Sequence, residues 1–339
     1  MSKSVSLKEI ASKVGVSVNT VSHALRDLPD ISEGLKRKIR KIALEMGYMP
    51  NHVAQTMKIE EKPLVAVHIS SFNNVYVNAF YQELTRVFSE KDDYSLTFVF
   101  STKDPVEVVK QCILIRADYL ISVNYFDEKA VEMAKLNNLH ILHTGGEFNP
   151  QKGEDYVFAD NDVGCRLVAR YLYGREKTGK YIYIGIPDYP DESLNIYNNV
   201  RREIFEDELK KLDEKAEILQ FRADDCNIDK ICSLIIGGCR NFFCFNDLEA
   251  YSLLRLLENR LGDIEKLFPD IEIVGFDGLC ISVVGMRDIT TVAVDYGKFS
   301  EQIYSVVKNR FENPSMDAQF VAVPVFMHYK KKQGDILTL

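Results

Sequence analysis

Apolar residues near the start of the chain recur with the spacing of three short helices. The first set falls at positions i, i+3, i+4 and i+7, which form one face of a helix: Leu7, Ile10, Ala11 and Val14. Gly15 then acts as a helix stop, and Ser17 is a good N-cap for a second helix. Similar spacing follows in the second helix and in a third, which Ser32 can cap: Val21, Ala24, Leu25 and Leu28, then Leu35, Ile39, Ile42, Ala43 and Met46.

Two helices joined by a short turn, with a third packed across them, form a helix-turn-helix unit. In such a unit the N-terminal half of the second helix reaches base edges in the major groove of DNA. The start of the second helix therefore supplies the candidate DNA-binding residues: Ser17, Val18, Asn19, Thr20, Ser22 and His23.

Charge separates DNA binding from the alternative, a small helical bundle that only mediates protein contacts. Residues 1–62 carry 11 Lys and Arg against 7 Asp and Glu, whereas the rest of the chain carries 31 against 43. A basic N-terminal domain on an acidic body fits phosphate binding by that domain alone. We therefore expect a double-stranded DNA partner.

Four short motifs in this segment resemble the DNA-binding domain of the LacI/GalR family of bacterial transcription regulators. They are Leu7-x-x-Ile10-Ala11, Gly15-Val16-Ser17, Thr20-Val21-Ser22 and Tyr48-x-Pro50-Asn51-x-x-Ala54. The resemblance implies a hinge helix at about residues 50–58, folded when a dimer binds its operator, with Asn51, Ala54 and Met57 at the minor groove. The family normally inserts Leu as an apolar wedge; Met57 can serve, or can be a linker residue that packs on the core.

Beyond a charged boundary at residues 58–63, strand-like and helix-like runs alternate. Short β-branched and aromatic runs, such as Leu64–Ile69 and Tyr181–Ile186, are separated by segments with helical spacing, such as Val200–Leu212. This alternation predicts parallel sheets covered on both faces. Nearly 280 residues exceed one such core, so the pattern predicts an α/β fold with two lobes.

The body also resembles the LacI/GalR core, which has the type I periplasmic-binding-protein fold. Its markers are Asp160-Asn161-x-x-Gly164, Asn246-Asp247-x-x-Ala250, Val274-Gly275-Phe276-Asp277 and Ile289-Thr290-Thr291-Val292. The resemblance implies that the chain crosses between lobes three times within an effector-binding core, residues 63–339. The first lobe would be about 63–176 and 295–318, and the second about 177–294 and 319–339, with a small-molecule effector between them.

Three polar residues follow predicted strands and are candidates for effector binding. Asp160 comes just after the run 156–159, Asp277 follows 271–276, and Asn246 follows 242–245. By the resemblance, the two Asp positions contact the effector, since carboxylates there can accept hydrogen bonds from sugar hydroxyls. Each residue also suits a helix cap or a turn, which stays the alternative.

Arg201 and two aromatic residues complete the candidate effector site. Arg201 precedes Phe205 where the family has Arg-x-x-Gly-Phe. Its guanidinium offers several hydrogen-bond donors in a fixed fork. The alternative is that Arg201 is a solvent-exposed charge on a helix and binds no effector. Phe72 and Phe221 follow or end strand-like runs, where they either stack on the effector or pack in the core. The chain departs from the family at Gly278, where many members have another Asp, and it contains no Trp.

Several other function classes lack their motifs. There is no G-x-G-x-x-G, Walker or G-x-S-x-G motif, so we expect no enzyme activity and no cofactor. The seven cysteines contain no C-x-x-C pair, and we expect small apolar residues rather than metal ligands. With neither a signal peptide nor an apolar run of membrane length, we expect a cytoplasmic protein that binds no membrane. The combined prediction is a homodimeric repressor that binds a near-palindromic operator and a sugar-like effector.

Overall fold

The computed structural model describes residues 6–25, 28–46, 62–70, 75–101, 104–124, 126–144, 154–175, 179–186, 196–224 and 226–331. The predicted hinge helix with Asn51, Ala54 and Met57, and the candidate Phe72, lie outside these residues. The chain divides into two compact units, Met1–Lys62 and Pro63–Leu339. No helix among the described residues is long and apolar enough to cross a membrane.

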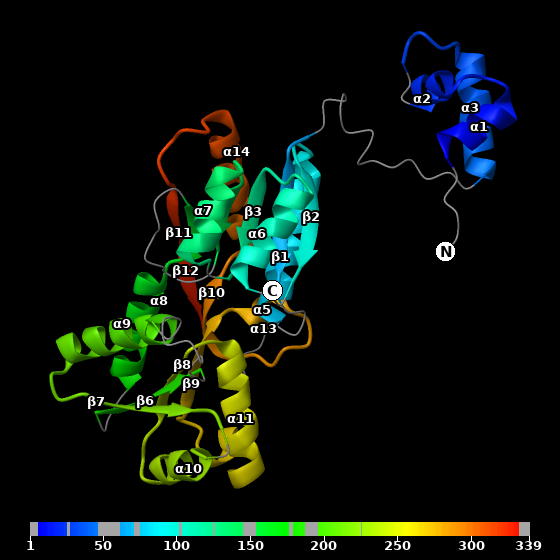
Figure 1. Ribbon diagram of the computed structural model, residues 1–339. Coiled ribbons are helices and arrows are strands. Elements are labelled where there is room, and N and C mark those ends of the chain that lie inside the picture. The colour runs from blue at the N-terminus through cyan, green and yellow to red at the C-terminus, as the bar shows by residue number, and fades with distance from the viewer. Residues whose placement is uncertain are drawn as a thin grey trace, which may run out of the picture. The chain divides into compact units, whose positions relative to one another are not determined.

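The N-terminal unit contains the three helices that the apolar spacing predicts (Figure 1). They are α1 (Leu7–Val14), α2 (Val18–Leu25) and α3 (Glu33–Glu45). Their inward faces form one small core from Ile10, Ala11, Val21, Ala24, Ile39 and Ala43. A capping box starts α1: the Ser6 side chain accepts from the Glu9 N–H, while the Glu9 carboxylate accepts from the Ser6 N–H.

The first lobe of the core is built on a parallel sheet of six strands in the order β11-β5-β4-β3-β1-β2. The strands are β1 (Leu64–Ile69), β2 (Ser95–Phe100), β3 (Tyr119–Ser122), β4 (His140–His143), β5 (Asp155–Ala159) and β11 (Phe320–Val323). Side chains alternate along β1: Val65 and Val67 pack with α5 (Val75–Lys91) and α14 (Tyr296–Glu312), whereas Ala66 packs with α6 (Pro105–Leu114) and α7 (Glu128–Leu136). Helices therefore cover both faces, as a parallel sheet requires.

The second lobe has a six-stranded sheet in the order β12-β10-β9-β8-β6-β7, in which only β12 is antiparallel. The strands are β6 (Lys180–Gly185), β7 (Glu217–Arg222), β8 (Asn241–Cys244), β9 (Glu272–Asp277), β10 (Thr290–Val294) and β12 (Val325–His328). On one face lie α8 (Asn161–Arg175) and α9 (Ile196–Leu212), and on the other α10 (Ile228–Ile236) and α11 (Asp247–Leu261). Two short helices, α12 (Ile264–Leu267) and α13 (Leu279–Ser282), flank β9.

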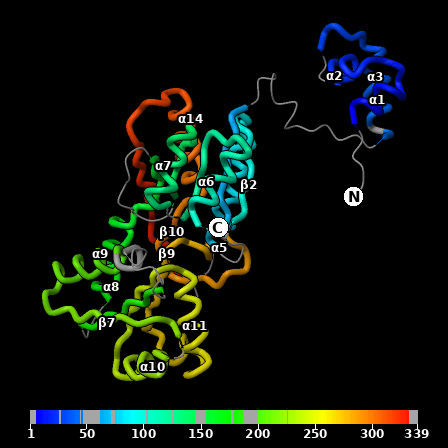
Figure 2. Tube along the Cα trace, viewed as in Figure 1, coloured from blue at the N-terminus to red at the C-terminus, as the bar shows by residue number. Residues whose placement is uncertain are grey.

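The predicted fold class, a helix-turn-helix domain followed by a two-lobed α/β core with parallel sheets, is confirmed. Two predicted crossing points between lobes are wrong. Residues 161–175 form α8, whose apolar side packs on α9 and the second sheet rather than on the first. Residues 320–323 form β11, which pairs with β5, so the last crossing follows residue 323. Figure 2 shows the orange α14 in the lobe that also holds the cyan elements.

A buried ion pair attaches α14 to the first sheet. Arg310 is 3% exposed, and its Nη2 donates to Asp155 Oδ1 at 2.7 Å. The Tyr119 hydroxyl donates to the same carboxylate, so each buried polar group has a partner. This network joins parts of the chain that are 155 positions apart in the sequence.

Candidate functional site

The start of α2 presents the candidate DNA-binding residues. The Thr20 N–H donates to Ser17 Oγ at 3.0 Å, so Ser17 caps the helix, and the Thr20 hydroxyl lies 2.8 Å from the Ser17 hydroxyl. Val18 is 45% exposed and Asn19 is also exposed. These two side chains are therefore available to contact a neighbouring molecule without breaking the cap.

Ser22 and His23, one turn further along α2, are half-buried. His23 Nδ1 lies 2.5 Å from Asp30 Oδ2, which ties the imidazole to the segment before α3. The exposed side of α3 carries four cations suited to phosphate contact: Arg37, Lys38, Arg40 and Lys41. These four cations are not among the sequence-predicted DNA-binding residues, although they alternate with apolar positions in the sequence.

In the core, Arg201 and Asp277 come together at the carboxyl end of the second sheet. Arg201 projects from α9, and its Nη2 lies 3.6 Å from Oδ1 of Asp277, the last residue of β9. Arg201 Nε donates to Asn161 Oδ1 at 2.9 Å, and Nη1 donates to the Phe245 carbonyl. The guanidinium also lies 3.7 Å from the centroid of the Phe276 ring, in a cation–π contact.

Burial makes the Asp277 carboxyl unusual. It is 6% exposed, and burial raises its pKa to about 8, although the Arg201 guanidinium opposes the rise. Its φ of 118° lies in a region that residues other than glycine rarely adopt. The Tyr296 hydroxyl, from the first lobe, donates to the Asp277 carbonyl at 2.8 Å, and Tyr76 packs edge-on against Tyr296. The residues around Asp277 thus come from both lobes.

Gly278 explains one departure from the family pattern. Its φ is 74°, and a Cβ there would lie 2.7 Å from Ala293 Cβ. A side chain at this position would therefore require β10 to shift. The close approach of β10 thus favours glycine at this position in this chain.

Asp247 holds the turn after Asp277 in place and was quoted in the sequence only as part of a motif. It is fully buried, with Oδ2 accepting from the Leu279 N–H and Oδ1 from the Thr291 hydroxyl, both at 2.6 Å. Burial raises its pKa to about 6 in spite of these hydrogen bonds. Asp247 is thus a supporting residue rather than an exposed ligand contact.

The other sequence-predicted residues adopt the structural roles that were weighed against binding. Asp160 accepts from the Val163 N–H at 3.0 Å at the start of α8, and Asn246 accepts from the Glu249 N–H at 2.9 Å and caps α11. Capping leaves one polar atom of each side chain available. Phe221 is 8% exposed and belongs to the apolar cluster of the second lobe, away from the Arg201 contacts described above.

Asn161, Phe276, Tyr76 and Tyr296 join Arg201 and Asp277 without having been predicted as site residues. Asn161 and Phe276 lay within quoted motifs, beside the chosen aspartates. Nothing in the sequence marks Tyr76 and Tyr296 as site residues, because a tyrosine in an apolar helix predicts only a position in the core.

A separate pocket of about 610 Å³ lies in the second lobe, between α8, α12 and the segment that follows β12. Its lining mixes aromatic and charged side chains, including Tyr171, Arg175, Glu272, Tyr329 and Lys330. None of the predicted effector residues is among its lining residues, so it is distinct from the Arg201–Asp277 cluster.

Known proteins resemble this chain over nearly its full length. The family model described as "Bacterial regulatory proteins, lacI family" matches residues 6–51. The ribose operon repressor of Lactococcus lactis is 24% identical over 334 residues, which cover 96% of this chain and 97% of that protein. The transcriptional repressor PurR of Vibrio parahaemolyticus is 21% identical, with 91% and 92% covered.

Solved structures support the same fold. The Lac repressor dimer bound to operator and the anti-inducer ONPF superposes with a TM-score of 0.72 at 16% identity, covering 97% of this chain and 99% of that one. A LacI family regulator from Enterococcus faecium with bound ribose gives a TM-score of 0.61 at 16% identity, with 79% and 97% covered.

Proposed function

Because the chain belongs to the LacI/GalR family of bacterial transcription regulators, we propose that it is a homodimeric repressor of a near-palindromic operator, controlled by a sugar or sugar derivative. The observation that carries DNA binding is the capped start of α2, which leaves Val18 and Asn19 exposed. Asn can pair bidentately with adenine, and Val can pack on a thymine methyl group. Two copies of the domain would contact two half-sites.

The proposed effector site is the Arg201–Asp277 cluster between the lobes. A guanidinium and a carboxyl group 3.6 Å apart offer both donors and an acceptor to vicinal hydroxyls. The tyrosine rings from the first lobe supply an apolar wall. The relatives favour a sugar as the effector. One is a ribose operon repressor, and similar solved structures hold ribose, cellobiose or D-xylulofuranose.

Control of DNA binding follows from linkage between effector and operator. Tyr296 of the first lobe contacts the Asp277 backbone of the second, so a ligand bound at Asp277 acts on contacts between lobes. If effector and operator prefer different lobe arrangements, effector binding lowers operator affinity by the same factor by which operator binding lowers effector affinity. The hinge would transmit the change to the two DNA-binding domains.

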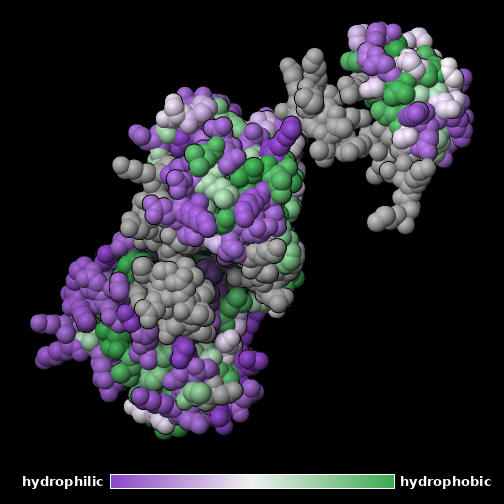
Figure 3. All heavy atoms as spheres, in the orientation of Figure 1, coloured by the Kyte–Doolittle hydropathy of each residue, from purple (hydrophilic) through white to green (hydrophobic). Residues whose placement is uncertain are grey.

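The proposed dimer surface lies around α5 in the first lobe. Phe98, on the edge strand β2, is 44% exposed beside Tyr81 of α5. Ile281 and Val284 are exposed in and after α13, which also packs on α5. Figure 3 shows polar residues over much of one face of the core, with apolar residues gathered in smaller patches. Neighbouring exposed apolar side chains such as those around α5 are therefore candidates for an interface.

Selection of operators from random duplex DNA by the full chain tests the proposal. We expect enriched sequences with two-fold symmetry and steep loss of affinity with salt. A panel of pentoses, hexoses and disaccharides is then tested for a change in operator affinity. Enrichment without two-fold symmetry would contradict the dimeric repressor, and no effect of any sugar would contradict the effector class.

A further inference from the structure

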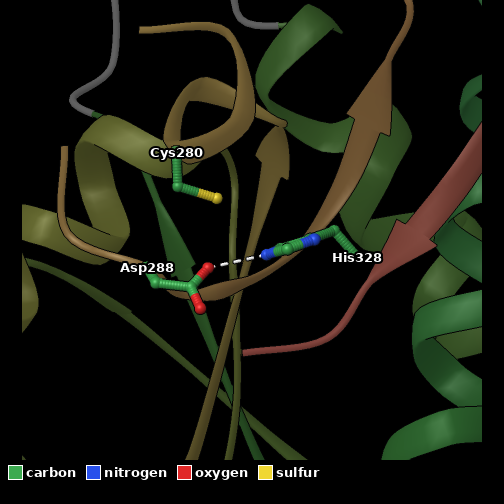
Figure 4. A group of neighbouring side chains, drawn as sticks. All are labelled: Cys280, Asp288 and His328. Carbon is green, nitrogen blue, oxygen red and sulfur yellow. Dashed lines mark hydrogen bonds and ion pairs between the residues drawn. The ribbon is translucent and has the colours of Figure 1, made fainter. Parts of the chain in front are cut away.

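Three side chains with different metal-binding atoms meet beside the second sheet (Figure 4). Cys280 comes from α13, Asp288 from the segment before β10, and His328 from the end of β12. One sulfur, one carboxylate oxygen and one ring nitrogen all lie within 4.8 Å of one another. We propose that these residues bind a divalent transition-metal ion, with Zn²⁺ the best match to the donor set.

The sheet itself brings the three residues together. β12 runs antiparallel to β10, and His328 is paired with Thr291, just beyond Asp288. The Cys280 thiol donates to the Ile289 carbonyl at 3.6 Å, which fixes it against the same segment. The sequence spacing gave no hint of this, since His328 and Asp288 are 40 positions apart. The expectation that the cysteines are only small apolar residues is therefore revised at Cys280.

Small side-chain movements would create the coordination geometry. Asp288 Oδ1 now lies 2.6 Å from His328 Nε2. Around Zn²⁺, with bonds of about 2.0–2.3 Å, tetrahedral ligand atoms lie roughly 3.3–3.7 Å apart. The Asp288–His328 contact must open by roughly 0.7 Å, and the thiol, whose sulfur already lies within 4.8 Å of both other ligand atoms, must approach by at most roughly 1.5 Å. All three residues are half-buried, so their side chains have room to adjust while an ion can still reach them.

The surroundings also suit an ion. Asp288 Oδ2 accepts from the Lys331 N–H at 2.9 Å, which orients the carboxylate and leaves Oδ1 directed at His328. Such a second hydrogen bond is the usual support for a metal ligand. Ca²⁺ and Mg²⁺ prefer oxygen ligands only, whereas sulfur with imidazole and carboxylate suits Zn²⁺ or Co²⁺. Three protein ligands leave one coordination position for water.

The alternative is an Asp288–His328 ion pair that merely ties β12 to the segment before β10. That role does not need the thiol, so a metal-dependent signal from Cys280 distinguishes the two. The metal proposal stands independently of the proposed regulatory function, because it rests on side chains outside both candidate sites.

Cobalt titration of the reduced, metal-free full-length protein tests the proposal. We expect a thiolate-to-cobalt absorption band in the near ultraviolet that Zn²⁺ abolishes. The substitution Cys280→Ser should remove the band, and His328→Gln or Asp288→Asn should weaken metal affinity by roughly tenfold or more. Cys226→Ser is the matched control, since Cys226 is an exposed free cysteine outside the cluster, and it should keep the band.

A second measurement distinguishes loss of metal binding from unfolding of a variant. Zn²⁺ should raise the melting temperature of the native chain and of the Cys226→Ser variant. It should not raise that of His328→Gln, provided that circular dichroism shows this variant to be folded like the native chain. Absence of both the band and the temperature shift in the native protein would overturn the site. Persistence of the band in folded Cys280→Ser, or its loss in Cys226→Ser, would overturn the assignment of the ligands.

Discussion

The contacts of Arg201 restrict the chemistry of the inter-lobe site. Its guanidinium is held by Asn161, by the Phe245 carbonyl and by the face of Phe276, so it cannot turn freely toward a new ligand. Asp277 stands beside it at 3.6 Å. A polyol can use this pair through both kinds of hydrogen bond, accepting from the guanidinium and donating to a carboxyl oxygen.

Asp277 should make effector binding depend on pH. Because burial raises its pKa to about 8, this carboxyl is mainly protonated at pH 7. Hydroxyl donors favour the carboxylate, so binding should release a proton and affinity should rise as pH increases toward and through 8. Calorimetry in buffers of different ionisation enthalpy would measure the proton release. Proton uptake on binding would contradict the assignment, and Asp277→Asn should abolish the dependence.

Asn19 should read one base pair in each half-site. Asn19→Ala is expected to cost about 1–3 kcal/mol on the selected operator and to relax specificity at one position per half-site. Fluorescence anisotropy with operator and random duplexes would measure this. Arg37→Ala provides the contrast, because loss of a phosphate contact should weaken both duplexes alike. An equal loss on both duplexes for Asn19→Ala would show that it reads no base.

Among the elements, α8 links packing to the proposed site. A Cβ on Gly164 would lie 2.7 Å from Phe276 Cε2, so this glycine lets the helix press against the ring that supports Arg201. Asn161, at the start of the same helix, binds the Arg201 guanidinium directly. The position of α8 therefore sets the position of two groups around Arg201.

Gly164→Ala should consequently disturb the site from a distance. Overpacking against Phe276 is expected to cost about 1–3 kcal/mol of unfolding free energy and to lower effector affinity. Gly174→Ala is the matched control, because it lies in the same helix with nothing within 4 Å of its added Cβ. Denaturant unfolding and sugar titration of both variants would check this. Equal behaviour of the two variants would contradict the role of Gly164.

Most elements were predictable because their apolar periodicity is local. The spacing at Ile10 and Val21 and the β-branched run of β1 need no tertiary information. The lobe that receives α8 was not predictable, since an amphipathic helix pattern does not say which sheet the helix covers. β11 and β12 are only four residues each, too short for a pattern to assign them to different sheets.

The candidate site was partly predictable for the same reason. Asp277 follows a clear strand, so its place at the sheet edge could be inferred from sequence. Asp160 and Asn246 were identified by the same rule, and the structure gives each a capping hydrogen bond. The contribution of Tyr296 depends on how the lobes meet, which no local pattern records.

In the assembled protein, the surface around α5 should hold two copies together. Val284→Glu, combined with Phe98→Glu, is expected to convert a dimer into a monomer, because charges would replace exposed apolar side chains at the interface. Ile236→Glu is the control: Ile236 is 68% exposed but ends α10, on the outer face of the second sheet. Light scattering of the full chain would distinguish the states. A dimeric double variant, or a monomeric control, would contradict this surface.

The last crossing between lobes limits how the core can move. β11 ends at Val323 in the first sheet and β12 begins at Val325 in the second, so Pro324 alone spans the gap. Two peptide units reach only about 7 Å, and the proline ring fixes one of the backbone angles between them. The two sheets cannot slide apart here by more than a small fraction of a strand's length. The other two crossings are equally short, since one residue separates β5 from α8 and one separates β10 from α14. Opening of the core is therefore expected to be a rotation about these three short crossings, which turns a small change near Asp277 into a larger displacement at the far ends of the lobes.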